Sequence, residues 1–394
     1  MVAVFTEPRG APQRAPWRDE RAARNVLSAL AQTAAGLLDP ADRGVVTPAA
    51  DRSPLAVWLS RHDFGALGFA SALPLDPELA AMLRQAAIGA AAGNLAHFET
   101  LDRIERRFEA ERLPMVLLKG AAVACSAYRD PAFRPMTDID IWVHDDDMPR
   151  AVDQLRALGF LQEPGLPSRP GALQRRSGGE LVFRHGRREH GLVELHYGAF
   201  QGWWIQRAAQ PDLEALWRRA EPLGPGRHAL RLAAEDAILQ TAFHVVVNQF
   251  GQAPLRGLMD LAVIARAHRI DWDAVAARAL AWRLATATWL VLDTANRVIG
   301  LPGCGAAVSR LRPGPARRAA LRAFITPSAL LSGRDLRRQT RRHVFMLALV
   351  DRSRDGARLI GRTLWPERWW IAARYGRPVG RVEHLWGLVR RGAV

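Results

Sequence analysis

Residues 114–121 read PMVLLKGA and residues 138–143 read DIDIWV, and these two stretches decide the fold. The first is an apolar run of strand length that ends at Lys119 and Gly120, and residues 121–128 then have the pattern of a helix. The second alternates apolar with acidic or polar residues, as a half-buried strand does. Strand, glycine turn, helix and second strand predict a mixed α/β core.

Helical patterns surround this core. We expect helices over residues 19–38, 55–67, 77–112, 148–158, 234–250, 255–267 and 272–299, and further strands over 181–184 and 192–197. These patterns predict four regions: a flexible tail (1–18), an N-terminal helical region (19–99), a core (100–230), and a C-terminal helical region ending in an Arg/Trp-rich tail (231–394).

Two aspartates of the second strand, Asp138 and Asp140, are two residues apart and therefore point to the same face. Two carboxylates this close repel each other unless a cation lies between them, and oxygen ligands suit Mg²⁺ or Mn²⁺. Such a site can clamp metal ions for phosphoryl or nucleotidyl transfer. Glu194, on the strand over 192–197, fits as a third carboxylate, and Glu180 is a weaker candidate.

The turn between the first strand and its helix has the layout of a phosphate site. Gly120 allows close approach, and a helix N-terminus presents free N–H groups. Lys119 is the single lysine among 55 basic residues, which indicates a position where an ammonium is needed and a guanidinium does not fit. The alternative is a simple tight turn.

Composition excludes several classes of protein. The 394 residues are 49% hydrophobic and 24% charged, as in a globular chain, and no apolar stretch is long enough to span a bilayer. Two cysteines cannot form a disulfide framework, and charges interrupt the start of the chain where a signal peptide needs its apolar region. We therefore predict a cytoplasmic protein. Its net charge of +16 reflects either an Arg-rich composition or attraction to phosphates, which keeps RNA as a partner.

The order of these motifs resembles the polymerase-beta-like nucleotidyltransferase superfamily. Residues 113–143 (LPMVLLKGAAVACSAYRDPAFRPMTDIDIWV) and 192–197 (LVELHY) resemble more closely the bacterial family of uncharacterised nucleotidyltransferases. Weaker similarity extends over the helical stretches 80–112, 233–250 and 255–265. The resemblance implies a nucleotidyltransferase core with a small mixed sheet, flanked by helices.

The resemblance also implies roles for individual residues. Asp138 and Asp140 would be metal ligands, and Glu194 would act on the acceptor hydroxyl as general base or metal ligand. Gly120 would match a glycine of the nucleotide-binding turn. Here the chain departs from the usual Gly-[Gly/Ser], because Lys119 stands first and the next residue offers no hydroxyl, so that Lys119 would replace a serine–phosphate contact.

Other residues near these motifs complete the predicted site. The predicted nucleotide-binding set is Lys119, Gly120, Arg134 and Thr137. Arg134 either binds phosphate or is a solvated loop residue. His196 shares the face of Glu194 and either lines the site or is a core histidine, and Tyr128 either lines the site or packs and caps its helix.

For three further sets of residues we favour a structural role over a functional one. His185, His190 and His196 fit no standard zinc spacing, and His244, Arg256 and Asp260 lie on helices that could close the cleft. The C-terminal tail contains Trp365, Trp369, Trp370 and Trp386, which either stack on bases or pack the terminal helices onto the body.

The sequence therefore predicts an enzyme that moves an NMP from an NTP to an acceptor hydroxyl with release of pyrophosphate, using Mg²⁺ or Mn²⁺. Association of the resembled family with peptide or polysaccharide biosynthesis implies a small molecule, a peptide natural product or a sugar as acceptor. Two alternatives stay open. One is modification of a tRNA or another RNA end, and the other is a non-catalytic nucleotide- or RNA-binding protein that keeps the fold.

Overall fold

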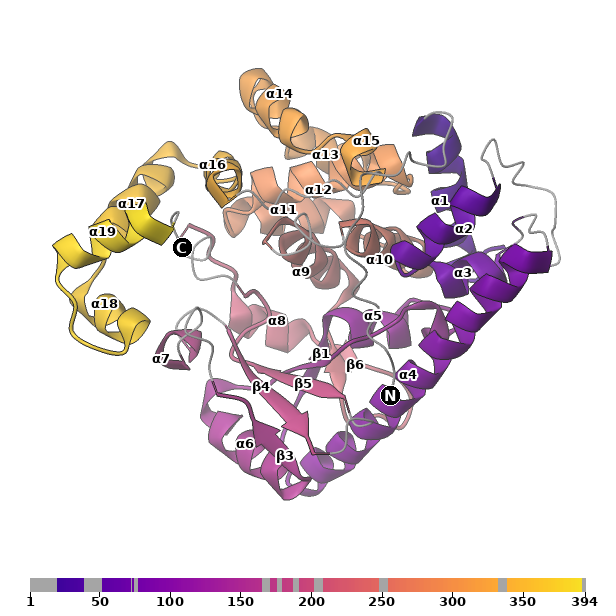
Figure 1. Cartoon of the computed structure of the whole chain (residues 1–394), viewed down its shortest axis with the longest axis horizontal. Helices are drawn as coiled ribbons and strands as arrows, with labels where there is room; N and C mark the ends of the chain where they lie inside the picture. The colour runs from indigo at the N-terminus through magenta and orange to yellow at the C-terminus, as the bar shows by residue number, and fades with distance from the viewer. Residues whose placement is uncertain are drawn as a thin grey trace.

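A computed structural model describes residues 20–38, 52–71, 73, 77–164, 171–175, 179–186, 191–201, 208–247, 254–331 and 339–391 (Figure 1). The tail predicted over 1–18 lies outside these residues. Within them, the strands are β1 (Val116–Leu118), β2 (Ile139–Trp142), β3 (Phe160–Gln162), β4 (Glu180–His185), β5 (Leu192–His196), β6 (Glu221–Pro222) and β7 (Leu230–Arg231).

These strands form a single mixed sheet in the order β3-β4-β5-β2-β1-β7-β6. β2 lies at its centre, antiparallel to β1 and parallel to β5. β1 is parallel to β7, and the pairs β3–β4, β4–β5 and β6–β7 are antiparallel. The predicted mixed α/β fold is therefore confirmed.

Helices cover both faces of the sheet and extend well beyond it (Figure 1). They are α1 (Glu20–Ala34), α2 (Arg52–Arg61), α3 (Gly65–Ala70), α4 (Pro77–Ala110), α5 (Lys119–Ser126), α6 (Met148–Ala157), α7 (Gly171–Gln174), α8 (Leu213–Arg219), α9 (Ala234–Val247), α10 (Pro254–Ala267), α11 (Trp272–Ala281), α12 (Ala285–Val298), α13 (Gly305–Arg310), α14 (Pro315–Phe324), α15 (Pro327–Leu331), α16 (Gln339–Ala348), α17 (Ser353–Leu364), α18 (Arg368–Tyr375) and α19 (Arg381–Arg391). None of the described helices combines the length and the apolar character that crossing a bilayer requires.

The alternation of side chains divides the sheet between two hydrophobic cores. Leu117 of β1, Ile141 of β2 and Leu195 of β5 pack with residues of α4 and α6 in one core. Val116 and Trp142 point to the opposite face and belong to the larger core, which includes residues of α1, α9, α10 and α12. The second face is therefore the one on which the polar residues of β2 and β5 lie.

Two predicted helices are each divided in the structure. Instead of one helix over 272–299, α11 ends at Ala281 and α12 begins at Ala285, with Arg283 between them at φ +58°. The Asp351 carboxylate accepts hydrogen bonds from the backbone N–H groups of Ala285 and Thr286, so the start of α12 is capped by a residue far along the chain. No local signal marked this break.

The helix predicted over 55–67 is likewise two helices, α2 and α3, because Asp63 between them adopts φ +62°. Aspartate tolerates this left-handed conformation better than most residues, since its short polar side chain can bond locally. The strands β3, β6 and β7 were not predicted, and their two or three residues are too few to show a period.

Candidate active site

The strand register brings the predicted carboxylates to one place. β2 and β5 are parallel neighbours in which Asp140 lies opposite Glu194, and Trp142 lies opposite His196. Their neighbours Ile139, Ile141, Val193 and Leu195 are buried in the core on the other face. The apolar residues of both strands thus fix the face on which Asp140, Glu194 and His196 must lie.

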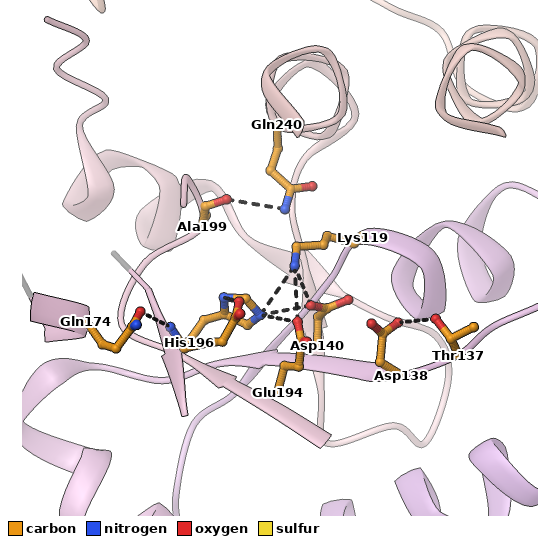
Figure 2. A network of polar contacts seen from close by, with 10 residues as sticks. Lys119, Thr137, Asp138, Asp140, Gln174, Glu194, His196, Ala199 and Gln240 are labelled. Atoms are coloured by element: carbon orange, nitrogen blue, oxygen red, sulfur yellow. Dashed lines mark hydrogen bonds and ion pairs between the residues drawn. The ribbon is translucent and has the colours of Figure 1, made fainter. Parts of the chain in front are cut away.

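Lys119 reaches the same face from the first residue of α5, which follows β1 directly. It adopts φ +48°, a left-handed conformation that costs a non-glycine residue about 1 kcal/mol or more. This backbone turns the chain directly from strand to helix, and the side chain points to Asp140 and His196 (Figure 2). A strained residue that places the only lysine of the chain among carboxylates supports a functional role for that lysine.

The four side chains form a compact buried cluster (Figure 2). Lys119 Nζ lies 2.6 Å from Asp140 Oδ1, 3.6 Å from Glu194 Oε2 and 3.5 Å from His196 Nε2. His196 Nε2 is in turn 2.8 Å from Asp140 Oδ1 and 3.7 Å from Glu194 Oε2. Glu180 Oε2 stands 3.9 Å from the other ring nitrogen of His196. The ammonium therefore occupies the centre of an acidic group.

Charge compensation sets the ionisation of the closest pair. Burial alone would raise the pKa of Asp140, but the ammonium of Lys119 and the ring of His196 bring that pKa well below its ordinary value. Burial alone would lower the pKa of Lys119, but Asp140 and then Glu194 raise it above its ordinary value. Lys119 and Asp140 are thus held as an ion pair.

For Asp138 and Glu194, the positive charge of Lys119 only partly offsets burial and the charge of Asp140. Burial, followed by the negative charge of Asp140, raises the pKa of Glu194 to about 9. Burial and Asp140 also raise the pKa of Asp138, with Lys119 and a hydrogen bond from Thr137 opposing the shift. The site contains more carboxylate than one ammonium can neutralise, so it favours a further cation.

The donor set fits a divalent metal ion. Ligand atoms of Asp140, Glu194 and His196 all lie within 4.8 Å of one another. Carboxylate oxygens suit Mg²⁺ and Mn²⁺, and the imidazole nitrogen adds a donor that Mn²⁺ accepts more readily than Mg²⁺. Asp138 lies just before β2 and outside this set. A metal ion would have to displace the ammonium of Lys119 from the centre of the cluster.

Arg134 is buried, so it is not the solvated loop residue that was one of the two predictions for it. Its guanidinium is buried and forms a two-pronged ion pair with Asp260 of α10, at 3.0 Å from Nε to Oδ1 and 2.9 Å from Nη2 to Oδ2. Burial alone would lower the pKa of Arg134, but Asp260 raises it above its ordinary value. Tyr128 donates a hydrogen bond of 2.9 Å to Asp260 as well. A Cβ on Gly120 would stand 3.0 Å from the guanidinium, so glycine leaves room for it.

The other predicted residues divide between the site and the structural framework. Thr137 is exposed and donates a hydrogen bond of 3.2 Å to Asp138, so it stands at the rim. Burial, followed by the charge of Lys119, lowers the pKa of His244 on α9 to about 3. His185 packs edge-on against Phe160, and His190 lies outside the described residues.

Two residues that build the site were not predicted. Asn94 of α4 donates hydrogen bonds to the backbone oxygens of Pro131 and Arg134 and accepts one from the backbone N–H of Met136. It thereby fixes the loop that leads into Asp138. Gln240 of α9 lies above Lys119 and donates to the Ala199 oxygen (Figure 2). The partners of both residues are distant in sequence. The one available sequence signal was that each is a polar residue on a helix face that is otherwise apolar.

Comparison with models of protein families shows to which family the chain belongs. Residues 64–300, more than half of the chain, match the model described as "Uncharacterised nucleotidyltransferase". The chain belongs to this nucleotidyltransferase family. The matched span runs from the residue before α3 to the end of α12, so it contains the whole sheet and the acidic cluster of this nucleotidyltransferase. A comparison with curated proteins finds no match.

Proposed function

We propose that this nucleotidyltransferase moves an NMP from an NTP to a hydroxyl group of an acceptor, with release of pyrophosphate. The observation that carries the proposal is the register of β2 and β5, which places Asp140 opposite Glu194 beside Lys119 and His196. Family membership supports the reaction class, and the excess of buried carboxylate supports the need for a divalent cation.

The residues of the cluster take distinct roles in this reaction. The acceptor oxygen attacks the α-phosphorus, the bond from that phosphorus to the β-phosphate oxygen breaks, and pyrophosphate leaves. Asp140, Glu194 and His196 would hold Mg²⁺ or Mn²⁺, with Asp138 beside them. The bound ion would neutralise charge that develops on the phosphate groups. Glu194 takes the hydroxyl proton, and Lys119 binds the triphosphate.

The nucleotide-binding residues of the proposal differ in how they act. Lys119 and Thr137 stand at the site and can contact phosphate directly. Arg134 is held by Asp260 and Gly120 lies against it, so both contribute by shaping the turn beneath Lys119. Tyr128, two residues after the end of α5, donates a hydrogen bond to Asp260 and so supports the same ion pair.

The acceptor in the proposal is a small molecule, a peptide natural product or a sugar, and the reaction takes place in the cytoplasm. Buried carboxylates around the reaction centre favour an uncharged hydroxyl over a polyanion as the attacking group, since they repel an acceptor that brings phosphates of its own. An RNA end therefore ranks second as acceptor.

Binding of NTPs to the purified protein tests the proposal. Each of the four NTPs is titrated by calorimetry with and without Mg²⁺ or Mn²⁺, for the wild type and for Asp138→Asn/Asp140→Asn. We expect metal-dependent binding of at least one NTP in the wild type and its loss in the double variant, because amides cannot replace the ionised oxygen ligands.

A matched control is Asp145→Asn/Asp153→Asn, which removes two exposed carboxylates outside the cluster. This control should bind NTP as the wild type does, and circular dichroism should show both double variants folded. Equal NTP binding by the wild type and Asp138→Asn/Asp140→Asn would refute the assignment of the site.

A further inference from the structure

The last three helices expose an unusual amount of apolar surface. Six of the fifteen large apolar side chains that are exposed among the described residues lie in this part of the chain: Ile360, Leu364, Trp365, Trp369, Val382 and Trp386. Figure 1 shows α17, α18 and α19 at one end of the long axis of the molecule, with α1–α3 at the other. We call these six residues the C-terminal apolar surface.

The three helices are nevertheless a folded unit. His384 of α19 is buried, and its ring nitrogens lie 2.9 Å from the Tyr375 hydroxyl of α18 and 3.0 Å from the Thr363 oxygen of α17. Trp370, buried on α18, packs edge-on against the His384 ring, whereas Leu359, buried on α17, packs on Ala208 and Val350 outside the three helices. The exposed apolar side chains are therefore those that remain after the helices have packed on one another and on the rest of the chain.

The exposed residues follow the surface periodicity of the helices. On α17, Ile360 and Leu364 are four residues apart and lie on one face. The guanidinium of Arg381, at the start of α19, stacks over the ring of Trp365 at 4.4 Å. Val382, which is 80% exposed, follows Arg381 directly. The apolar surface thus continues from α17 to α19.

The segment that carries this surface is rich in positive charge. Residues 352–391 contain ten arginines and three acidic residues, an excess of 10 − 3 = 7 positive charges. Each of the three acids already lies against an arginine: Asp355 against Arg283, Glu367 against Arg362, and Glu383 against Arg377. The exposed Arg352, Arg354 and Arg368 consequently present charge that these acids do not offset.

We propose that α17, α18 and α19 dock on the surface of an anionic lipid bilayer. Aliphatic side chains and tryptophans on one side of amphipathic helices enter the boundary between headgroups and acyl chains, where tryptophan is enriched. Arginines at the edge of such a surface bind anionic headgroups, and this attraction is electrostatic. The C-terminal apolar surface and its arginines supply both parts.

Charge and side-chain type select this occupant over two others. A second copy of the same surface would bring another seven positive charges, which repel. An RNA strand would satisfy the arginines and could stack on the tryptophans, but it offers no apolar medium for Ile360, Leu364 and Val382. A bilayer surface is complementary to the charge and to the aliphatic residues together.

Flotation of the full-length protein with lipid vesicles tests this docking. Vesicles of phosphatidylcholine alone are compared with vesicles that contain about one third phosphatidylglycerol, at increasing NaCl. We expect binding to the anionic vesicles, weakening with salt, and little binding to the neutral ones. In Leu364→Asp/Val382→Asp we expect binding to fall about tenfold or more, because both aliphatic contacts are lost.

The matched control is Val57→Asp/Leu161→Asp, which makes the same change of charge at two exposed aliphatic residues on α2 and β3. It should keep most of the binding, and both variants should keep the NTP binding of the wild type. The proposal fails if anionic vesicles do not bind, if the control loses as much binding as the test variant, or if a single-stranded RNA binds through Leu364 and Val382 while vesicles do not. Because the acidic cluster takes no part in docking, this failure is distinct from failure of the proposed reaction.

Discussion

The acidic cluster on the sheet and the C-terminal helices use charge in opposite ways. At the cluster, Asp140 and His196 are buried, Lys119 is partly buried, and each ionisable group stands within 4 Å of another. The opposite charges of Lys119 and Asp140 outweigh the effect of burial on the pKa of each. On α17–α19 the arginines are largely exposed, and their ion pairs lie at the surface. The net charge of +16 therefore sums charges that act in two ways. Buried charges determine the ionisation of the groups around them, and exposed charges determine which surfaces the molecule can bind.

The same division appears in the family match. The match ends at residue 300, so it includes the cluster and stops well before α17. Family membership therefore informs the function of the acidic cluster. The role of α17–α19 has to be inferred from the side chains of these helices. The predictions that follow compare the two regions directly.

Removing one partner of a buried ion pair should have the largest effect. Asp260→Ala leaves the Arg134 guanidinium buried without its carboxylate, and Tyr128 without its acceptor. We expect a loss of about 3–5 kcal/mol in the free energy of unfolding, because an uncompensated buried charge is costly. Urea denaturation followed by circular dichroism measures this loss.

The corresponding change on the C-terminal helices is Glu383→Gln, which removes the partner of Arg377 in an exposed pair. Its denaturation midpoint should match that of the wild type, since water and salt screen surface pairs. Equal losses in Asp260→Ala and Glu383→Gln would contradict the distinction between the two regions.

The sequence was sufficient for the fold class and for the residues that form the cluster. Asp138 could be placed on the face of Asp140, and His196 on the face of Glu194, because alternation along a strand is a local property. That the two strands lie side by side, with Asp140 opposite Glu194, is a tertiary contact that no local pattern specifies. Arg134 shows the limit most clearly, because its partner Asp260 is 126 residues away and decides that it is buried.

The prediction of helix ends was limited for the same reason, because distant contacts and unusual backbone conformations decide where these helices stop. Arg283 and Asp63 adopt left-handed backbone conformations that divide predicted helices, and Asp351 caps α12 from 66 residues away. Lys119 was singled out as the only lysine of the chain, but its position at the centre of the carboxylates depends on its φ of +48°, which the sequence does not specify. Tertiary contacts and special backbone conformations therefore account for most of what the sequence did not reveal.

The next largest effect concerns the pH dependence of metal binding. With its pKa at about 9, Glu194 carries a proton at neutral pH in the metal-free protein, whereas an ordinary glutamate loses it near 4.5. A metal ion must displace this proton, so the affinity for Mn²⁺ should rise with pH, by at most about tenfold per unit, and level off above about pH 9. Calorimetry in buffers of different ionisation enthalpy measures the released proton.

Two variants separate this titration from the general charge of the protein. Glu194→Gln should bind Mn²⁺ weakly and without the rise, because an amide has no proton to release. Arg354→Gln on α17 changes an exposed charge and should keep the full rise. A pH-independent wild type would show that Glu194 is ionised before the metal arrives.

Lys119→Met should have the smallest of these effects and the sharpest meaning. The ammonium now occupies the centre of Asp140, Glu194 and His196, so it competes with a metal ion for the same oxygens. Methionine fills similar space without charge, and we expect Mn²⁺ to bind about tenfold more tightly as the competing cation is lost. Binding of NTP in the presence of Mn²⁺ should weaken at the same time, because the group that holds the triphosphate is gone.

The opposite signs of these two changes are the informative result, and each is measured by titration of the same protein preparation. Arg368→Met on α18 removes an exposed positive charge from the other region and should alter neither affinity. If Lys119→Met weakened Mn²⁺ binding instead, Lys119 would be holding the carboxylates in position for the metal, and its ammonium would not be a competitor. If Arg368→Met changed Mn²⁺ affinity as much as Lys119→Met does, long-range charge would govern the site, and the separation between buried and exposed charge would not hold.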